Sequence, residues 1–564
     1  MKLSPAGREH VLKVIQDVKN GDSAMVPSSN EIDKWYLCDM IQHLVDEGNV
    51  KVVPVPVYGG WREVDTPVDL QRANNSMHYL NDQKGQAALV RSMGATFLSE
   101  ANDLKRPTEI VAKELNLDHD LLTSFIDGEV EMETAYNIMR CMSDNYPVAF
   151  SDLWIEKDDT QEGVRVFTAD ESKATARVLS RADRDGNRTP YYEYRDSAMS
   201  RIGPFRPEWI KELRVVDDND AYNPDIAYNN GHLMFQTTFF IGPVNFYYEL
   251  RGKKYCFEAN TGDSNFISPF VKHSFASRDP DNLGLIIAVT YGGAVRSALT
   301  DFGRVGASNL DAIAGDLRDI APARKQSLQR ALMAESMSSE QLCKGAAAGG
   351  AGSVERMRAI VNDGASPTDE ELKGIAEVLS VTPDLLRVHE LLPEEEVVIT
   401  TRASEADCEA YGLNPGHKEH LQRHEERPYP SEEDPSYRFT PLSRTKHHPN
   451  LKTFIMDVQA NTDEVQAGIT AGLHQFVYNY SEDNVTLRWG ADMANSRVLE
   501  PGASGYIAPM VEHAYETDSS DGTPSPVYVV RIPGCWTKET LDEFSSFETG
   551  GRSRVGGENM RWYN

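Results

Sequence analysis

The sequence has little cysteine: six residues in 564, widely spaced and without a Cys-x-x-Cys pair. Such spacing predicts free thiols in a reducing compartment and argues against a disulfide framework or a zinc knuckle. No segment reaches the roughly 18 consecutive apolar residues of a membrane helix, and the first residues lack the apolar stretch of a signal peptide. We therefore expect a soluble, cytoplasmic protein without a membrane partner.

Positive charge is scarce as well. The chain has 57 Lys and Arg against 87 Asp and Glu, a formal net charge of −30. Nucleic acids and anionic membranes bind net basic surfaces, so neither is expected as the main partner, although a local basic pocket for a small anion stays compatible. Neither a Gly-x-Gly-x-x-Gly nor a P-loop pattern occurs, so no sequence motif supports the binding of a nicotinamide, a flavin or a P-loop nucleotide.

The sequence contains an internal repeat. With 40% hydrophobic residues and this length, several packed units are expected. The segment "GDSNFISPFVKH" (262–273) recurs as "GASGYIAPMVEH" (502–513). Strand-like segments precede the two copies at 244–259 and 485–500, and β-rich runs follow them at 283–293 and 525–534. Short strands separated by Gly, Pro, Asn and Asp predict a sandwich or barrel that occurs twice.

Helical patterns precede each β-rich half. Residues 86–145 and 325–390 each predict a series of short helices, with apolar residues such as Ile110 and Leu115 at helical spacing. Both series resemble the small helix-turn-helix bundles of repressor-like proteins. The order along the chain is therefore helical, β, helical, β, after an N-terminal extension that includes a strand-like segment at 50–60.

The repeated frame, in which a proline and then a histidine follow a glycine, resembles the second motif of cupin barrels. The histidine after "NNG" (229–231) matches the first motif. The resemblance implies an α+β protein with two cupin domains, which are jelly-roll-like β-barrels, each preceded by a small helix-turn-helix-like helical bundle. The expected division is an N-terminal extension (1–80), a first helical bundle (81–150), a catalytic cupin (151–310), a second helical bundle (311–392) and a degenerate cupin (393–564).

The tandem order, together with "YNNGH" and "GDSNFISPFVKH", resembles the family of hydroxyethylphosphonate dioxygenase and methylphosphonate synthase over about residues 85–564. The resemblance implies a mononuclear non-haem Fe(II) enzyme whose metal is held by His232 and His273. In the dioxygenase pattern a glutamate occurs six positions before the second histidine, but Ile267 is found here. In the synthase pattern a glutamine four residues after the first histidine replaces it, and Gln236 matches. The metal ligands implied are His232, Gln236 and His273.

The resemblance also implies residues for the substrate. Asn229 and Arg184 would bind it, and Tyr194, with Tyr192 as an alternative, would bind it and take part in catalysis. Lys105, between two helices of the first bundle, would reach the metal site as a catalytic and substrate-binding residue, in a homo-oligomer from the same subunit or from a neighbour. An arginine offers a planar fork to a phosphonate and a lysine offers a point charge.

The function implied belongs to phosphonate biosynthesis. With dioxygen, the enzyme would cleave the carbon–carbon bond of 2-hydroxyethylphosphonate to methylphosphonate and carbon dioxide. The alternative within the family gives hydroxymethylphosphonate and formate. A cupin and helix-turn-helix transcriptional regulator is disfavoured because the DNA-facing helix near residues 118–134 is acidic. A sugar-phosphate isomerase would need no dioxygen.

The spacing of the two ligands on one strand sets a geometric demand. On a straight strand, His232 and Gln236 would lie about 13 Å apart, at about 3.3 Å per residue, and could not touch the same ion. We therefore expect the backbone to bend or bulge between them.

The second half lacks a complete copy of the ligand set. His513 corresponds to His273, and His474 lies 39 positions before it, which suggests a vestigial histidine pair. Neither Tyr478, four residues after His474, nor Ile507, six residues before His513, supplies a third ligand. We expect this half to be degenerate and structural, and the chain to bind one metal ion.

Overall fold

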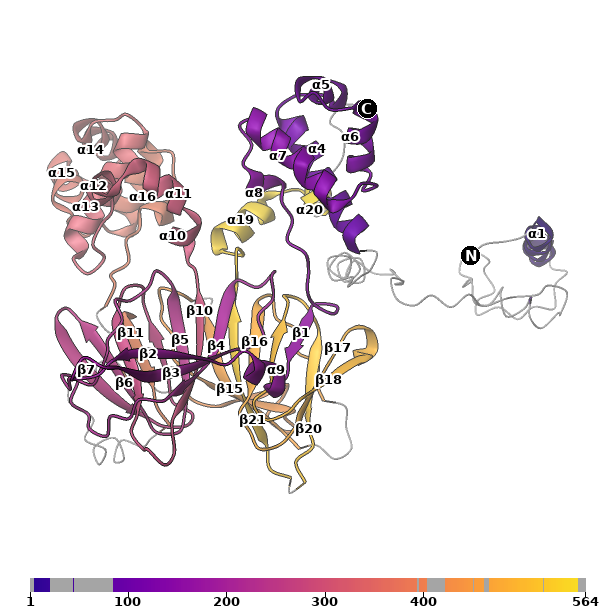
Figure 1. Cartoon of the computed structure of the whole chain (residues 1–564). Coiled ribbons are helices and arrows are strands. Elements are labelled where there is room, and N and C mark those ends of the chain that lie inside the picture. The colour runs from indigo at the N-terminus through magenta and orange to yellow at the C-terminus, as the bar shows by residue number, and fades with distance from the viewer. Residues whose placement is uncertain are drawn as a thin grey trace. The chain divides into compact units, whose positions relative to one another are not determined.

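The computed structural model describes most of the chain that follows the N-terminal extension (Figure 1). The chain separates into two compact units, residues 1–73 and 74–564. In the first unit, helix α1 (Pro5–Asn20) is described, whereas the strand-like segment 50–60 lies outside the described residues. The described residues are 5–20, 44, 85–392, 395–402, 421–422, 424–449, 451–460, 466–520 and 522–555.

The first helical group surrounds one apolar core and matches the short helices predicted from the sequence. The Asp118 side chain caps α6 by accepting hydrogen bonds from the backbone N–H groups of Asp120 and Leu121. A Cβ atom on Gly94 of α4 would lie 2.6 Å from the Cα atom of Ile126, so only glycine permits this close helix approach. The helices are α4 (Gly85–Asp103), α5 (Thr108–Glu114), α6 (His119–Ile126), α7 (Met132–Asn145) and α8 (Phe150–Leu153).

The second helical group follows the first β-rich half and has its own core. Capping boxes begin α14, with Ser338 and Gln341, and α16, with Thr368 and Glu371. None of the described residues in α10, α11 and α12 is buried. The helices are α10 (Ala294–Ser297), α11 (Leu299–Val305), α12 (Ala307–Ile313), α13 (Ile320–Ala334), α14 (Ser339–Ala348), α15 (Val354–Asp363), α16 (Asp369–Val378) and α17 (Pro383–Leu386).

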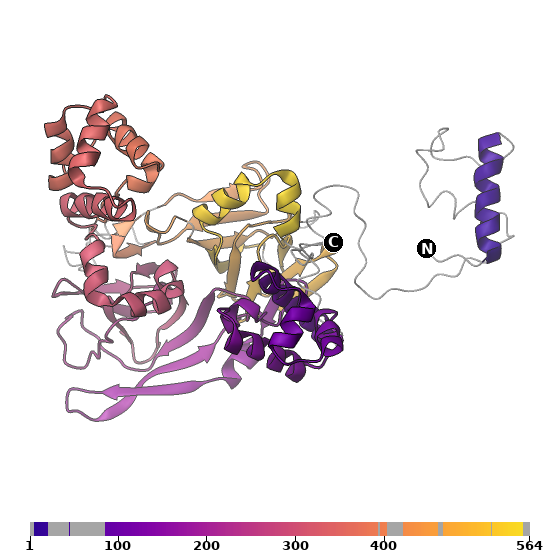
Figure 2. The same ribbon diagram turned by 90° about the horizontal axis from the view of Figure 1, so that it is seen from above.

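Two sheets enclose the first β core. The larger has eight strands in the order β12-β11-β8-β5-β10-β4-β3-β2, and the smaller has the order β7-β6-β9. Neighbouring strands are antiparallel except for β11 and β12, and Figure 2 shows the β2–β3 hairpin as a long ribbon. Phe240 and Ile286 of the larger sheet share a buried cluster with Phe246 and Phe275 of the smaller. The strands are β2 (Arg177–Ala182), β3 (Arg188–Asp196), β4 (Phe205–Glu212), β5 (Phe235–Ile241), β6 (Val244–Leu250), β7 (Lys253–Ala259), β8 (Ser264–Ile267), β9 (Lys272–Ser277), β10 (Leu285–Tyr291), β11 (Val397–Thr400) and β12 (Leu421–Gln422).

A second pair of sheets repeats this plan. A seven-stranded sheet has the order β1-β19-β16-β21-β15-β14-β13, and a three-stranded sheet has the order β18-β17-β20. The two large sheets pack against each other, where Phe239 stacks on Tyr528 with ring centroids 4.7 Å apart. The remaining elements are β1 (Val164–Phe167), α9 (Ala169–Ala174), β13 (Arg427–Tyr429), β14 (Tyr437–Pro441), β15 (Lys452–Val458), β16 (His474–Asn479), β17 (Val485–Trp489), a 3₁₀ turn (Ala491–Met493), β18 (Asn495–Leu499), β19 (Ser504–Ile507), β20 (His513–Thr517), β21 (Ser525–Ile532), α19 (Lys538–Ser546) and α20 (Thr549–Val555).

Each large sheet takes a strand from the other half of the sequence. β1 precedes the strands of the first half but pairs with β19 in the seven-stranded sheet. β11 follows the second helical group but pairs with β8 in the eight-stranded sheet. The two β halves are therefore joined through backbone hydrogen bonds as well as through the apolar layer between them.

The repeat seen in the sequence is a repeat of structure. Both copies form a strand, a turn and a second strand, β8 to β9 and β19 to β20. The turns also match: Phe270 has φ 63° and Met510, at the corresponding position, has φ 64°. Positive φ angles are uncommon outside glycine, so the shared value marks a common backbone path.

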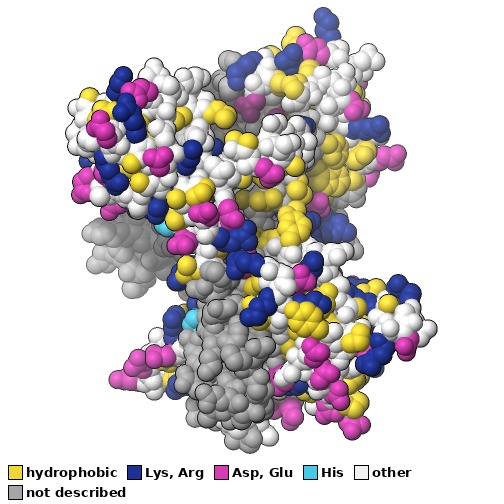
Figure 3. Space-filling model, turned by 90° about the vertical axis from the view of Figure 1, so that its left-hand side faces the viewer, with side chains coloured by type: hydrophobic (Ala, Val, Ile, Leu, Met, Phe, Trp, Pro, Cys, Tyr) yellow, Lys and Arg dark blue, Asp and Glu magenta, His cyan; other side chains and the backbone are white. Residues whose placement is uncertain are grey.

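Among the described helices, none is long and apolar enough to cross a membrane. On the face drawn in Figure 3, Lys and Arg side chains lie interspersed with Asp and Glu side chains.

Candidate active site

The structure brings His232, Gln236 and His273 together between the eight-stranded and three-stranded sheets. His232 precedes β5, Gln236 is the second residue of β5, and His273 is the second residue of β9. The two imidazole centroids are 5.4 Å apart, and Nε2 of His232 lies 3.2 Å from Oε1 of Gln236. The chain bends at residues 233–234, before the strand begins. This confirms the bend that the spacing requires.

Backbone carbonyls orient both imidazole rings. Nδ1 of His232 lies 2.9 Å from the oxygen of Met234, and Nδ1 of His273 lies 2.8 Å from the oxygen of Val271. Because a carbonyl oxygen only accepts hydrogen bonds, each Nδ1 bears a proton, and Nε2 is the ring nitrogen that can bind a metal ion. Burial lowers the pKa of His273 to about 4, so this ring is neutral near pH 7.

The amide of Gln236 is oriented by a neighbouring threonine. Its Nε2 atom donates to Oγ1 of Thr238 at 2.9 Å, which turns Oε1 toward His232. Nε2 of the histidine and Oε1 of the glutamine, each able to bind a metal ion, thus face each other across 3.2 Å. A cation bound by both atoms would fit this arrangement.

Sheet register explains how a glutamine can replace a glutamate. Gln236 on β5 pairs directly with Ile267 on β8. Side chains at directly opposite positions of an antiparallel pair have Cβ atoms about 4.5–5.5 Å apart and point to the same face. A ligand at either position would therefore approach the same region. The structure places an amide on β5 and an alkyl group on β8.

Asn229 holds the bend that precedes His232. Its Oδ1 atom accepts from the backbone N–H groups of His273, at 3.0 Å, and Gly231, at 2.9 Å, and its Nδ2 atom lies 2.9 Å from Nε2 of His273. Gly231 has φ +72°, and a Cβ there would lie 2.5 Å from the carbonyl carbon of Phe270. Only glycine fits this turn, which accounts for the "NNGH" sequence.

The two candidate tyrosines lie on β3. Tyr192 is buried; its hydroxyl accepts from the backbone N–H of Phe275 at 3.0 Å and lies 3.2 Å from Oγ of Ser274. Tyr194 is half-buried, with its ring 5.7 Å from that of Tyr192, and burial raises the pKa of its hydroxyl. The hydroxyl of Tyr192 is thus used in hydrogen bonds within the fold, whereas the hydroxyl of Tyr194 remains protonated and able to donate.

Arg184 and Lys105 lie in turns. Arg184 follows β2 and is 55% exposed, and it forms an ion pair with Asp225, whose carboxylate also accepts from the Arg184 backbone N–H at 3.1 Å. This ion pair lowers the pKa of the Asp225 carboxyl. Lys105 lies between α4 and α5 with φ 59°, and its Nζ atom is 3.4 Å from the carbonyl oxygen of Asn102 and 3.3 Å from that of Asp103. The structure thus engages the Arg184 guanidinium with the Asp225 carboxylate.

Arg181 is close enough to His273 for its charge to act on that imidazole. It is on β2, and its Nη1 atom donates to the carbonyl oxygen of Ala227 at 2.6 Å. Its guanidinium lies 5.1 Å from the ring centroid of Tyr192, and its positive charge contributes to the lowered pKa of His273. Arg184, the arginine predicted to bind the substrate, lies three positions later in the chain.

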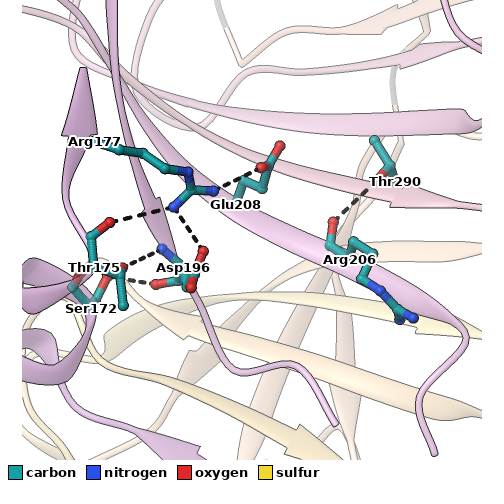
Figure 4. A network of polar contacts seen from close by, with 7 residues as sticks. All are labelled: Ser172, Thr175, Arg177, Asp196, Arg206, Glu208 and Thr290. Atoms are coloured by element: carbon teal, nitrogen blue, oxygen red, sulfur yellow. Dashed lines mark hydrogen bonds and ion pairs between the residues drawn. The ribbon is translucent and has the colours of Figure 1, made fainter. Parts of the chain in front are cut away.

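An acidic group also lies near His232. Figure 4 shows Arg177 between the carboxylates of Asp196, at 2.8 Å, and Glu208, at 3.3 Å. Burial raises the pKa of Glu208, while Arg177 and His232 act in the opposite direction. Glu208 on β4 and Thr238 on β5 both pair with Ala288 of the intervening strand β10. Glu208 therefore lies on the same sheet face as Thr238 and Gln236. It was not found from the sequence because this face forms only when the three strands pair.

In the described part of the chain, no three His, Cys, Asp or Glu side chains meet in a group that could hold a metal ion. Among these residues, the histidine pair therefore has no third ligand of these four types.

Comparison with known proteins agrees with this geometry. No family model matches the chain. The methylphosphonate synthase of Nitrosopumilus maritimus (strain SCM1) is 33% identical over 493 residues, which cover 86% of this chain and 97% of that protein.

This chain belongs to the methylphosphonate synthase family. Its members, with the related hydroxyethylphosphonate dioxygenases, are non-haem iron oxygenases of phosphonate biosynthesis. The structure resembles that of Streptomyces albus hydroxyethylphosphonate dioxygenase with 2-hydroxyethylphosphonate and Fe(II) bound, with a TM-score of 0.72, 29% identity and coverage of 85% of this chain and 100% of that one. Native PhpD with cadmium atoms shares the fold, with a TM-score of 0.60, 19% identity and coverage of 82% and 99%.

The second half of this family member lacks the first histidine. The backbone N–H of Phe270 donates to the carbonyl oxygen of His232 at 2.9 Å, and the matching N–H of Met510 donates to that of Ala471 at 2.7 Å. Ala471 therefore occupies the position of His232.

The expectation of a vestigial pair between His474 and His513 is consequently wrong. His474 points into the layer between the two large sheets, where its Nδ1 atom lies 2.7 Å from the hydroxyl of Tyr506. His513 corresponds to His273, with Nδ1 2.9 Å from the oxygen of Val511. The ring of His513 lies between the seven-stranded and three-stranded sheets, where it contacts Gln475. The two histidines therefore lie on opposite sides of the seven-stranded sheet.

Proposed function

We propose that this protein is a methylphosphonate synthase, which cleaves the carbon–carbon bond of 2-hydroxyethylphosphonate with Fe(II) and dioxygen. One substrate and one dioxygen give methylphosphonate, carbon dioxide and water, so the substrate supplies all four electrons. The proposal rests on one observation: the amide oxygen of Gln236, opposite an apolar Ile267, faces His232. A relative that is named methylphosphonate synthase and spans 86% of the chain supports it.

Three neutral side chains would hold the iron: His232 and His273 through Nε2, and Gln236 through Oε1. Fe(II), when bound, supplies open positions for substrate and dioxygen and exchanges electrons with them. Because these side chains bring no negative charge, a dianionic phosphonate would balance the divalent ion. The buried environment would strengthen that attraction.

The chain would bind the rest of the substrate through polar groups at the edge of the site. Asn229, already against His273, and the protonated hydroxyl of Tyr194 would donate to it. We assign the phosphonate charge to Arg181 in place of Arg184, because Arg184 is paired with Asp225. Lys105 stays a proposed catalytic residue, delivered by the first helical group of the same or a neighbouring subunit.

Apolar side chains around His273 would exclude water from the reaction. Tyr248 lies opposite His273 on β6, and the ring of Phe275 lies 5.7 Å from the imidazole. In a dry site, the hydrogen that completes the methyl group has to come from the one-carbon fragment of the substrate. Deuterium at the hydroxyl-bearing carbon should therefore appear in methylphosphonate.

The finer architecture follows from the same family membership. We infer that each pair of sheets is a cupin barrel, that each helical group is a helix-turn-helix-like bundle, and that the five-part division of the chain holds apart from the exchanged strands. A homo-oligomer in the cytoplasm, with small molecules as its partners, is part of this proposal. Sedimentation of the purified protein tests the assembly, and a monomer would reject it.

The deciding experiment is phosphorus NMR of the products. The protein is loaded with Fe(II) without air, mixed with 2-hydroxyethylphosphonate and exposed to dioxygen, and carbon dioxide and formate are measured in the same sample. Methylphosphonate with carbon dioxide is expected. Hydroxymethylphosphonate with stoichiometric formate would instead identify a hydroxyethylphosphonate dioxygenase, the activity named for the Streptomyces albus structure. No dioxygen-dependent turnover would reject both.

A further inference from the structure

Besides His513, which corresponds to His273, the second half keeps another ligand position with the same residue type. Gln475 on β16 pairs with Ile507 on β19, as Gln236 on β5 pairs with Ile267 on β8. The glutamine was not recognised from the sequence, because counting from His474 places the equivalent position at residue 478. With His513, the second half thus retains a glutamine and a histidine on the inner faces of its sheets, and Nε2 of the glutamine lies 3.0 Å from Nε2 of that histidine.

A cation is already present at this position. Arg531 on β21 pairs with Gln475, and the corresponding partner of Gln236 on β10 is Thr290. The Nε atom of Arg531 donates to Oε1 of Gln475 at 2.7 Å. The amide oxygen that faces the metal position in the first half therefore faces a guanidinium in the second.

The amide is held in this orientation from its other end. Nε2 of Gln475 donates to the hydroxyl of Tyr515 at 2.8 Å, as Nε2 of Gln236 donates to Thr238. In each half a hydroxyl group holds the amide nitrogen, from the same strand in the first half and from β20 in the second, and the amide oxygen meets a different group.

No acidic residue that the structure describes balances the charge of Arg531. No carboxylate forms an ion pair with Arg531 among the described residues, and its Nη2 atom is buried without a hydrogen-bond partner there. The guanidinium lies 5.7 Å from the ring centroid of Phe439 and 5.6 Å from that of Phe454. Burial lowers the pKa of His513 to about 4, so the histidine is a neutral neighbour. A cation held by an amide oxygen and neutral rings is the electrostatic arrangement of a metal site with neutral ligands.

We propose that Arg531 is the resident cation of the second half, whose guanidinium takes the place of the metal ion and keeps this half metal-free. The absence of a histidine at position 471 removes one ligand, and the fixed positive charge repels a divalent ion from the remaining two. The inference rests on the proposed metal site of the first half. It explains why the duplicated ligands Gln475 and His513 stay buried without a metal.

The test transplants the first site into the second half of the full-length chain. All variants carry His232→Ala, so that the first site is lost, and metal per chain is measured after loading with Co(II) and desalting, together with the Co(II) absorption spectrum. The single variant should bind no Co(II). Adding Ala471→His with Arg531→Thr should restore one ion per chain, with a ligand-field band. Adding Ala471→His alone should not, because Arg531 remains.

Three results would overturn the inference: one ion in the variant that keeps Arg531, no ion in the folded variant with both transplanted residues, or two ions per chain in the unmodified protein. Circular dichroism and the melting temperature establish folding. If the transplanted variant does not fold, the reverse change decides. Thr290→Arg should place a guanidinium on Gln236 and abolish Co(II) binding in the first half, whereas the uncharged Thr290→Met should preserve it. Unchanged binding in Thr290→Arg would refute the role of charge.

These results separate the two proposals. If Co(II) remains bound after His232→Ala while the second half is unchanged, the proposed first site is wrong. The role of Arg531 is then decided by comparing the Ala471→His variants with and without Arg531→Thr.

Discussion

Thr238→Val is expected to weaken metal binding, whereas an equally buried threonine on the same strand should not affect it. Thr238 is fully buried, and its Oγ1 atom accepts from Nε2 of Gln236 at 2.9 Å. An amide, unlike a carboxylate, has one end that binds a metal and one that does not. The hydrogen bond to Thr238 satisfies the second end and so leaves Oε1 directed at His232.

The magnitude follows from the lost hydrogen bond. Valine has nearly the shape of threonine, so the main loss is an acceptor for a buried N–H, which costs about 1–3 kcal/mol. Residues that orient a metal ligand from behind typically change metal affinity by about 10–100-fold. We expect the Kd for Co(II) to rise within that range, and Thr238→Ser, which keeps the hydroxyl, to restore most of the affinity.

Thr237→Val supplies the matched control. Thr237 is also fully buried on β5, but its hydroxyl donates to the carbonyl oxygen of Asn265 at 3.1 Å and faces the layer between the large sheets. The two valine variants should lose similar stability in urea unfolding of the metal-free protein, and only Thr238→Val should lose Co(II) affinity in calorimetric titration. Equal affinities in both variants would refute the orienting role of Thr238.

Three further predictions follow from the site and its surroundings. Arg181→Met should raise KM for 2-hydroxyethylphosphonate by about 100-fold or more, as expected for a lost charge-assisted contact, whereas Arg184→Met should change it by less than about threefold; the reverse order in steady-state kinetics would restore Arg184 as the anion ligand. Gln236→Ala should abolish Co(II) binding and the added Ile267→Glu should restore it, because the two positions are directly opposite; a double variant without metal would contradict the register argument. Burial lowers the pKa of His448 to about 4 from an unfolded value of about 6.5. Its contribution to the free energy of unfolding is therefore complete above pH 6.5 and is lost as the pH falls toward 4, with a slope of up to about 1.4 kcal/mol per pH unit. His448→Phe should flatten this part of the stability curve in urea unfolding, and an unchanged slope would exclude the residue as a contributor.

Local patterns in the sequence were sufficient for the helical groups and the repeated strand–turn–strand segments. Helical spacing predicted the short helices of the first group, and the demand for a bend between His232 and Gln236 followed from strand geometry alone. The strand exchange could not be predicted, because β1 and β11 have no local feature that selects a partner in the other half.

One prediction failed because a residue count was used to assign a residue to a sheet face. In the second half, the equivalent of His232 is Ala471, which is 42 positions before His513, against 41 positions between His232 and His273. His474, the histidine chosen as the counterpart of His232, lies three residues after Ala471 and therefore on the other face. The choice between Arg184 and Arg181 as the substrate's arginine stays a prediction.

The two halves solve the same electrostatic problem in different ways. In the first, the three proposed neutral ligands would leave a divalent ion to be balanced by an incoming dianion, and the nearby Glu208 is already paired with Arg177. A glutamate in place of Ile267 would add a buried negative charge that needs another cation, so an amide ligand suits a site with few free positive charges. In the second half no substrate has to enter, and the monovalent guanidinium of Arg531 can remain permanently. One arginine on the strand beside the glutamine is therefore enough to prevent metal binding at a duplicated site. The glutamine and the histidine then remain as ordinary hydrogen-bonding groups.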